Sequence, residues 1–125
     1  MNTILVVEDN PRIAAALTVR LRAAGYDVLT AADGRAGILS AVSRKPDLII
    51  SDIWMPEPMG FLNRNRLHQL GLAEVPVIYI TASKKPDLPE IAREEGAAAF
   101  FEKPFDAKAL LHAVAEALEH RTLAA

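Results

Sequence analysis

Five short apolar stretches alternate along this chain with five helix-like segments, and this alternation constrains the fold more than any other feature. The stretches lie at residues 3–7, 26–31, 47–51, 75–80 and 97–101. Strands that are buried on both faces have continuous apolar sequences of this kind, and helical crossovers between them make neighbouring strands parallel. The sequence therefore predicts an α/β fold, a doubly wound five-stranded parallel sheet with five helices in three α/β/α layers.

The helix-like segments between these stretches carry apolar residues at helical spacing and have recognisable ends. Asn10-Pro11 starts the first of them, with proline at the first helical position, and Gly25 ends it. The fourth begins at Asp87, where Glu90 three residues later predicts a capping box. The expected helices cover about 11–24, 34–45, 61–70, 87–95 and 107–120.

Length and composition favour one globular domain. The chain has 125 residues, of which 51% are hydrophobic, so we expect a domain over 1–121 and a frayed tail at 122–125. Fourteen basic and sixteen acidic residues give a net charge of -2, which argues against direct nucleic-acid binding. Disulfides and thiolate metal sites are excluded because cysteine is absent. Neither a membrane-spanning run nor a signal segment is evident, so we expect a cytoplasmic location without a membrane partner.

Polar residues stand where four of the apolar stretches end. Glu8 and Asp9 follow the first, Asp52 the third, Thr81 the fourth and Lys103 the fifth. Because parallel strands end at one edge of their sheet, these side chains are expected to share one cleft. Three carboxylates so close would repel each other, and a divalent cation removes that penalty. Magnesium prefers oxygen ligands and commonly binds carboxylates together with a phosphate, so the pattern predicts a site for Mg²⁺ and a phosphoryl group.

Each of these residues also has an ordinary structural interpretation when it is taken alone. Asp52 or Thr81 could cap a turn, and Lys103 could be a solvated surface lysine. Their combination favours the site, in which Lys103 would place a positive charge on a phosphate and Thr81 would donate its hydroxyl. Ala82 is small enough for its backbone N–H to approach an anion, and Pro104 permits a cis bond after the lysine.

Four motifs in order make the chain similar to the receiver domains of two-component response regulators. The resemblance runs from about residue 3 to residue 120 and implies the strand order 2-1-3-4-5. The motifs are Val7-Glu8-Asp9-Asn10, Asp52-Ile53-Trp54-Met55-Pro56 with Gly60, Thr81-Ala82, and Lys103-Pro104-Phe105.

The resemblance also implies a role for each site residue. Asp52 would accept the phosphoryl group, which Thr81 and Lys103 would contact with Ala82 and Trp54 beside it. The magnesium ligands would be Asp9, Asp52, the backbone carbonyl of Trp54 and, mostly through water, Glu8. Thr81 and Phe100 would form the switch, because Phe100 is the aromatic residue three positions before the lysine.

The implied activity is that of a signalling switch. A partner histidine kinase or phosphotransfer protein would supply the phosphoryl group, and the chain would catalyse only its own phosphotransfer and autodephosphorylation. Phosphorylation would then change the face formed by the fourth helix, fifth strand and fifth helix, which would bind an output domain or effector protein. A phosphorylation-dependent dimer would be one outcome of this change. The ring of Trp54 is either a loop aromatic or a cover that slows hydrolysis of the acyl phosphate.

Two other classes of function remain as alternatives. The first is a pseudo-receiver, an interaction module without phosphorylation, and the complete set of acidic residues, Thr81 and Lys103 argues against it. The second is a magnesium-dependent phosphohydrolase or a flavodoxin-like binder. The hydrolase would need a second Asp two residues after a strand-one Asp, and the binder a phosphate loop rich in Ser, Thr or Gly. The segment Glu8-Asp9-Asn10-Pro11 supplies neither.

Overall fold

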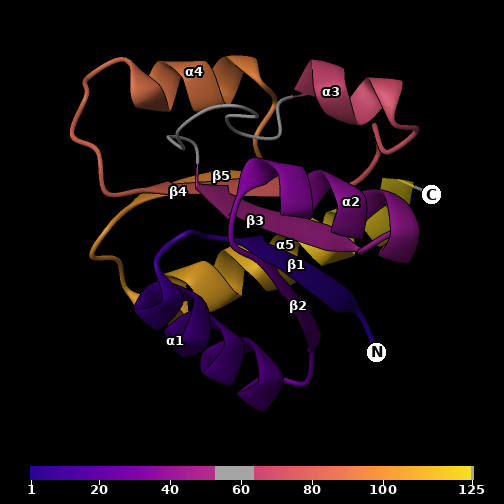
Figure 1. The fold of residues 1–125 in the computed structure, drawn as a ribbon, viewed down its shortest axis with the longest axis horizontal. Helices are drawn as coiled ribbons and strands as arrows, with labels where there is room; N and C mark the ends of the chain where they lie inside the picture. Colours follow the sequence, from indigo (N-terminus) through magenta and orange to yellow (C-terminus); the bar gives the residue numbers. More distant parts are fainter. Residues whose placement is uncertain (53–63, 125) are drawn as a thin grey trace.

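Five parallel strands form a single sheet in the order β2-β1-β3-β4-β5, in a computed structural model that describes residues 1–52 and 64–124 (Figure 1). The predicted fold and strand order are therefore confirmed. The strands are β1 (Thr3–Val7), β2 (Asp27–Ala31), β3 (Leu48–Asp52), β4 (Val77–Thr81) and β5 (Ala99–Glu102). The helices are α1 (Pro11–Ala23), α2 (Gly34–Arg44), α3 (Arg64–Gln69), α4 (Leu88–Glu94) and α5 (Ala107–Ala124).

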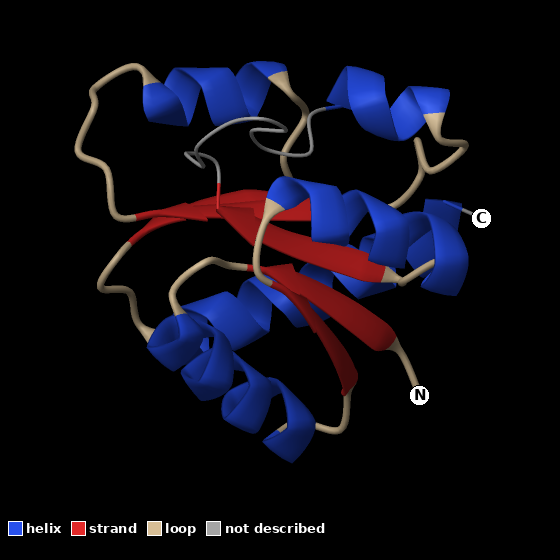
Figure 2. Cartoon of the chain, viewed as in Figure 1, coloured by secondary structure: helices blue, strands red, loops and turns tan. Residues whose placement is uncertain are grey.

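Helices cover both faces of the sheet (Figure 2), which separates two apolar cores. Helices α2, α3 and α4 pack on one face through Ala41, Leu67 and Leu88, and α1 and α5 pack on the other through Leu17 and Val114. All five residues of β3 and of β4 are buried, as expected for central strands covered on both sides. This arrangement leaves β2 and β5 as the two end strands and brings the carboxyl ends of β1, β3 and β4 together.

The expected start and end of the first helix are confirmed by its hydrogen bonds. Asn10 is the N-cap residue, and its Oδ1 accepts from the N–H groups of Arg12 at 2.9 Å and Ile13 at 3.4 Å. Pro11 occupies the first helical position, where no N–H is needed. Gly25 follows the helix with a φ of 99°, a conformation that glycine adopts without strain.

Three expected features of the chain are wrong in detail. Asp87 precedes α4, but its side chain makes no capping hydrogen bond, because its own backbone is already near-helical with φ -87° and ψ -9°. Strand β5 begins at Ala99 and not at 97, since the Ala97 N–H still donates to the Ala92 carbonyl of α4 at 3.1 Å. Helix α5 continues past His120, where neither glycine nor proline stops it.

Two further expectations concern the start of the third helix and the bond before Pro104. Residues 61–63, where the third helix was expected to begin, lie outside the described residues, and α3 is described over Arg64–Gln69. The peptide bond between Lys103 and Pro104 is cis, as the sequence permitted. Within the described part of the chain, none of the helices combines the length and apolarity needed to cross a bilayer.

Candidate functional site

The carboxyl ends of the strands surround a cavity of about 220 Å³. It contains every described residue that the sequence assigned to the metal and the phosphoryl group, while Phe100 is outside it. The lining residues are Glu8, Asp9, Asn10, Ile13, Asp52, Thr81, Ala82, Ser83 and Lys103. The topology therefore unites residues that are up to 95 positions apart in the sequence.

Three carboxylates meet in this cavity. Glu8 and Asp52 are buried, with 2% and 6% of their surface exposed, and Asp9 is open to solvent. One carboxylate oxygen from each of the three lies within 4.8 Å of the others. A hard divalent cation such as Mg²⁺ takes oxygen ligands at this kind of spacing and keeps water on its open side, so the donor set fits the predicted cofactor.

Lys103 bridges two of these carboxylates. Its Nζ donates to Asp52 Oδ2 at 3.1 Å and also to Glu8 Oε1. Only 10% of the lysine side chain is exposed. Burial acts to lower the pKa of Lys103, but the hydrogen bond to Glu8 and the charge of Asp52 outweigh it, so the pKa is raised. The lysine therefore stays charged beside the carboxylate that would accept the phosphoryl group.

Glu8 is held from two sides. While Lys103 binds Oε1, the backbone N–H of Asn10 donates to Oε2 at 2.9 Å. Burial is the main effect on the Glu8 carboxyl and raises its pKa, and these two hydrogen bonds oppose the shift. Sequence reasoning missed this function of Asn10, although its position directly after the acidic pair was a usable signal.

Thr81 is completely buried at the end of β4. Its Oγ1 accepts from the N–H of Ser83 at 3.0 Å, and its carbonyl accepts from the N–H of Lys103 at 2.7 Å. The first bond orders the turn that carries Ala82, and the second joins the ends of β4 and β5. Ser83 was not among the expected site residues, although a hydroxyl residue two positions before it is a known signal for such a turn.

Lys84 is a second residue that the sequence did not identify. Its Nζ donates to Glu102 Oε2 at 3.3 Å and to the Lys103 carbonyl at 3.4 Å. Because Lys84 and Glu102 are largely exposed, this contact adds little stability. It nevertheless links the turn after β4 to the segment that carries the site lysine.

The other two expected site residues are Phe100 and Trp54. Phe100 is half-buried in β5 and packs against the core under α3 and α4. Trp54 lies outside the described residues, together with Met55, Pro56 and Gly60 of the same motif. The roles expected for Phe100 and Trp54 therefore stay predictions.

The sequence as a whole matches one protein family. The family model of the response regulator receiver domain matches residues 4–115. This chain belongs to that family.

Curated relatives and solved structures agree with this assignment of the receiver domain. The DNA-binding dual master transcriptional regulator RpaA of Synechocystis sp. is 37% identical over 98% of this chain and 51% of its own length. The transcriptional regulatory protein PdtaR of Mycobacterium tuberculosis is 35% identical over 89% of this chain and 54% of its own. The chain thus spans about half the length of these curated relatives.

Among solved structures, the signal receiver domain of a putative Luxo repressor protein from Vibrio parahaemolyticus superposes with a TM-score of 0.87. It is 30% identical, and the match covers 98% of this chain and 93% of that one. The chemotaxis protein CheY4 of Vibrio cholerae gives a TM-score of 0.82 at 30% identity, with 94% and 98% covered. The receiver fold is therefore shared over nearly the whole chain.

Proposed function

We propose that this receiver domain accepts a phosphoryl group from a partner's phosphohistidine onto Asp52, with Mg²⁺ as the cofactor, and acts as a phosphorylation-controlled switch. One observation carries the proposal: Glu8, Asp9 and Asp52 converge in one cavity with the Lys103 ammonium bonded to Asp52. Acidic oxygens beside a fixed cation are suited to stabilising phosphoryl transfer, whose transition state spreads charge over the equatorial oxygens.

The chain's residues would divide the reaction among them. An oxygen of Asp52 forms the new P–O bond as the P–N bond to the donor's imidazole breaks. Lys103 already contacts Oδ2, so its ammonium needs only a small movement to reach a phosphoryl oxygen. The Thr81 hydroxyl and the Ala82 N–H supply hydrogen bonds to the remaining oxygens.

Bound Mg²⁺ would supply positive charge to both the carboxylates and the phosphoryl oxygens. Asp9 and Asp52 would hold it directly, Glu8 mostly through water, and the backbone carbonyl of Trp54 would complete the set.

The surface beside the site suits a protein donor such as a histidine kinase or phosphotransfer protein. A groove of about 510 Å³ between α1 and α5 opens at Lys103 and Ala82. Ile13 and Leu111 line it with apolar surface, and Arg12 adds positive charge. An apolar groove with a basic rim can receive a partner helix and orient its phosphoryl group toward Asp52.

The proposed readout uses Thr81 and Phe100. Movement of Thr81 toward the phosphoryl group frees space at the end of β4, and Phe100 in the neighbouring strand turns inward to occupy it. The face formed by α4, β5 and α5 then changes for an output domain, an effector protein or a second copy. A cytoplasmic setting, in which kinases and effectors are available, belongs to the same proposal.

Phosphorylation by a small donor tests the proposal directly. The protein is incubated with Mg²⁺ and acetyl phosphate, and its intact mass is followed. We expect the mass of one added phosphoryl group on the wild type and on the control Asp87→Ala, whose exposed side chain makes no capping bond. Asp52→Ala should show none. A wild type without the adduct would instead favour the pseudo-receiver, and an unchanged adduct on Asp52→Ala would move the acceptor elsewhere.

A further inference from the structure

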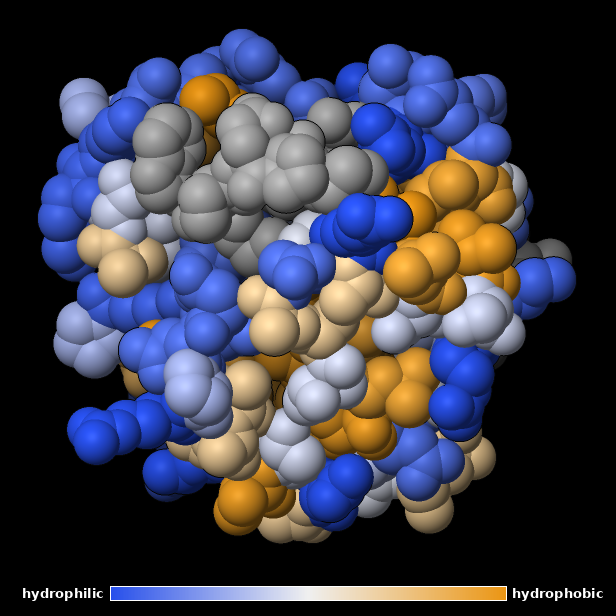
Figure 3. All heavy atoms as spheres, viewed as in Figure 1, coloured by the Kyte–Doolittle hydropathy of each residue, from blue (hydrophilic) through white to orange (hydrophobic). Residues whose placement is uncertain are grey.

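The two helices that pack on the end strand β2 carry the most exposed large apolar side chains of the described residues, apart from Met1. These exposed side chains are Val19 of α1 at 68%, Leu39 of α2 at 65% and Val42 of α2 at 45%. Figure 3 shows apolar residues gathered over the region where α2 lies and again toward α1 and β2. Val19 and the two α2 residues belong to helices on opposite faces of the sheet, and both helices contact β2. Exposed apolar side chains beside a free strand edge can contribute to an interaction surface.

The outer edge of β2 presents main-chain groups in a defined pattern. The Asp27 N–H donates to the Asn2 carbonyl at 2.9 Å, and the Ala31 carbonyl accepts from the Glu8 N–H at 2.9 Å. Both residues thus direct their main-chain groups toward β1. Since these directions alternate along a strand, Val28 and Thr30 direct their N–H and C=O groups away from the sheet. Two donors and two acceptors are therefore available at this edge, the feature that allows another strand to be added.

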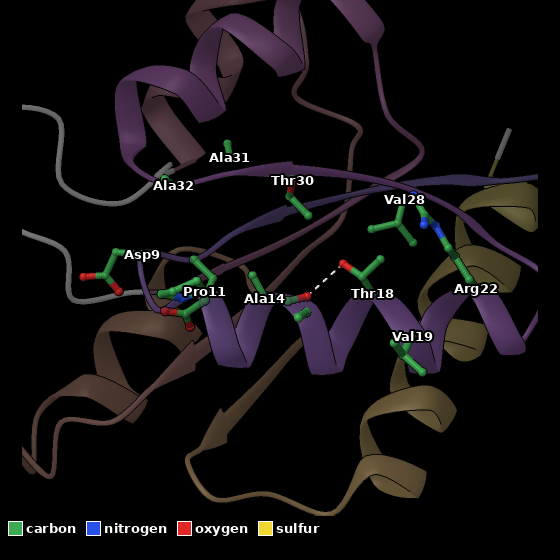
Figure 4. Close-up of a pocket in the computed structure, with 12 residues that line it drawn as sticks. Asp9, Pro11, Ala14, Thr18, Val19, Arg22, Val28, Thr30, Ala31 and Ala32 are labelled. Carbon is green, nitrogen blue, oxygen red and sulfur yellow. Dashed lines mark hydrogen bonds between the residues drawn. The ribbon is translucent and has the colours of Figure 1, made fainter.

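A groove runs along the same edge, between β2 and α1. It has a volume of about 510 Å³, and Figure 4 shows Thr18 of α1 pointing toward Val28 and Thr30 of β2. Val19 lies at the exposed rim of this groove. Its two ends carry opposite charges: Asp9 lies at one end and Arg22 at the other. The groove is apolar along most of its length, so its charged side chains lie mainly at the two ends.

We propose that this edge is the contact between two copies of the chain, joined through antiparallel pairing of their β2 strands. A two-fold axis beside Leu29 places Val28 of one copy opposite Thr30 of the other, so each outward donor meets an acceptor. The same axis places the Arg22 end of one groove over the Asp9 end of the other. The surface is therefore complementary to itself in both hydrogen bonding and charge, as a two-fold interface requires. It also brings Val19, which lines the groove, toward the surface of the other copy.

Sedimentation velocity over a series of protein concentrations, without Mg²⁺, tests this proposal. We expect the wild type to dimerise reversibly, and more weakly as salt is raised. Thr30→Pro removes one outward N–H per copy at a position where a strand tolerates proline, because that N–H serves no bond within the sheet. We expect it to weaken the dimer by about tenfold or more, a difference that sedimentation resolves easily. Val19→Glu is a second variant, on the exposed face of α1. Its carboxylate would repel the same carboxylate of the other copy, and the substitution leaves the residues of the sheet unchanged.

The control Ala109→Lys places a charge on the exposed surface of α5 beside β5, the end strand opposite β2. It should leave dimerisation unchanged. Circular dichroism shows whether each variant is folded, and Val19→Glu decides the outcome if Thr30→Pro is not. The proposal is overturned by a wild type that stays monomeric at millimolar concentration, by dimers that both β2-edge variants leave intact, or by dissociation in Ala109→Lys. A chain that stays monomeric but binds an extended peptide along β2 would also overturn the proposal, because the edge would then bind a different partner.

Discussion

The ammonium of Lys103 bridges Asp52 and Glu8, donating to Asp52 Oδ2 at 3.1 Å and to an oxygen of Glu8. The three side chains come from the ends of β5, β3 and β1, and each is at least nine-tenths buried. The ammonium between them is the positive charge that both buried carboxylates share, and buried charge is costly when it is not compensated. The lysine is consequently part of the folded site as well as of the proposed chemistry.

Replacing Lys103 by methionine keeps the length of the side chain and removes its charge. We expect Lys103→Met to lower the free energy of unfolding of the metal-free protein by about 3–5 kcal/mol, because two buried carboxylates lose the ammonium that they share. Urea unfolding measures this change. Phosphorylation by acetyl phosphate should also become much slower at saturating Mg²⁺. Lys108→Met, on the exposed surface of α5, is the matched control and should change neither quantity. A variant as stable as the wild type would show that the carboxylates do not need the lysine.

Much of this site could be predicted from the sequence because its residues follow directly from strand ends. Once the five apolar stretches are taken as parallel strands, the position of Glu8, Asp52 and Thr81 at one edge is a consequence of topology. The detailed hydrogen bonds depend on backbone turns that the spacing of residues in the sequence does not reveal. The bonds from Asn10 to Glu8 and from Ser83 to Thr81 require particular turns, and they became visible only in the structure.

The same distinction explains the helix ends. Asn10 has an extended backbone, with φ -86° and ψ 112°, and its side chain reaches the first turn of α1. Asp87 has the same kind of cap sequence but a near-helical backbone, and its side chain makes no capping bond. Residue type alone predicted both caps, and the local backbone conformation decided which one formed.

These two caps lead to a paired prediction on stability. Asn10→Ala should lower the free energy of unfolding by about 1 kcal/mol, the usual effect of losing an N-cap side chain. The backbone N–H of residue 10 still donates to Glu8 in this variant, so Mg²⁺ binding should persist. Asp87→Ala should change stability by less than about 0.5 kcal/mol, as for most surface substitutions. Chemical denaturation of both variants checks the pair, and equal effects would contradict the assignment of the caps.

Magnesium itself should stabilise the protein through Asp9, the exposed member of the carboxylate trio. A ligand that binds only the folded state adds about 2.7 kcal/mol when its concentration is 100 times the Kd. We therefore expect Mg²⁺ to raise the Tm of the wild type. Asp9→Asn should remove most of this rise without lowering the metal-free Tm, since it relieves repulsion among three acidic groups.

The control for this experiment is Asp87→Asn, which removes the same charge from an exposed position that does not line the cavity. It should keep the full response to Mg²⁺. An Asp9→Asn variant that responds as strongly as the wild type would place the cation elsewhere, and a wild type without any response would remove the basis for a metal site.

The contact between Gly37 of α2 and Val7 of β1 gives a prediction about packing directly behind the site, because Val7 precedes Glu8. A Cβ at position 37 would lie 2.8 Å from Cγ2 and 3.1 Å from Cγ1 of Val7, which is completely buried. Alanine favours a helix over glycine by about 0.5–1 kcal/mol, but forcing atoms into a packed core costs about 1–3 kcal/mol. We therefore expect Gly37→Ala to be destabilising despite the better helix propensity.

A double-mutant cycle identifies the cause. Val7→Ala alone should destabilise by about 2 kcal/mol, because it removes two buried methyl groups. In the double variant, the new methyl group at residue 37 occupies the space that Val7 vacates, so the loss should be smaller than the sum of the single losses by about 1 kcal/mol or more. Gly37→Ala combined with Val28→Ala, whose side chain packs in the core on the other face of the sheet, should instead be additive. Urea unfolding of the singles and doubles measures both cycles, and additivity in the first would show that α2 shifts away from β1 without strain.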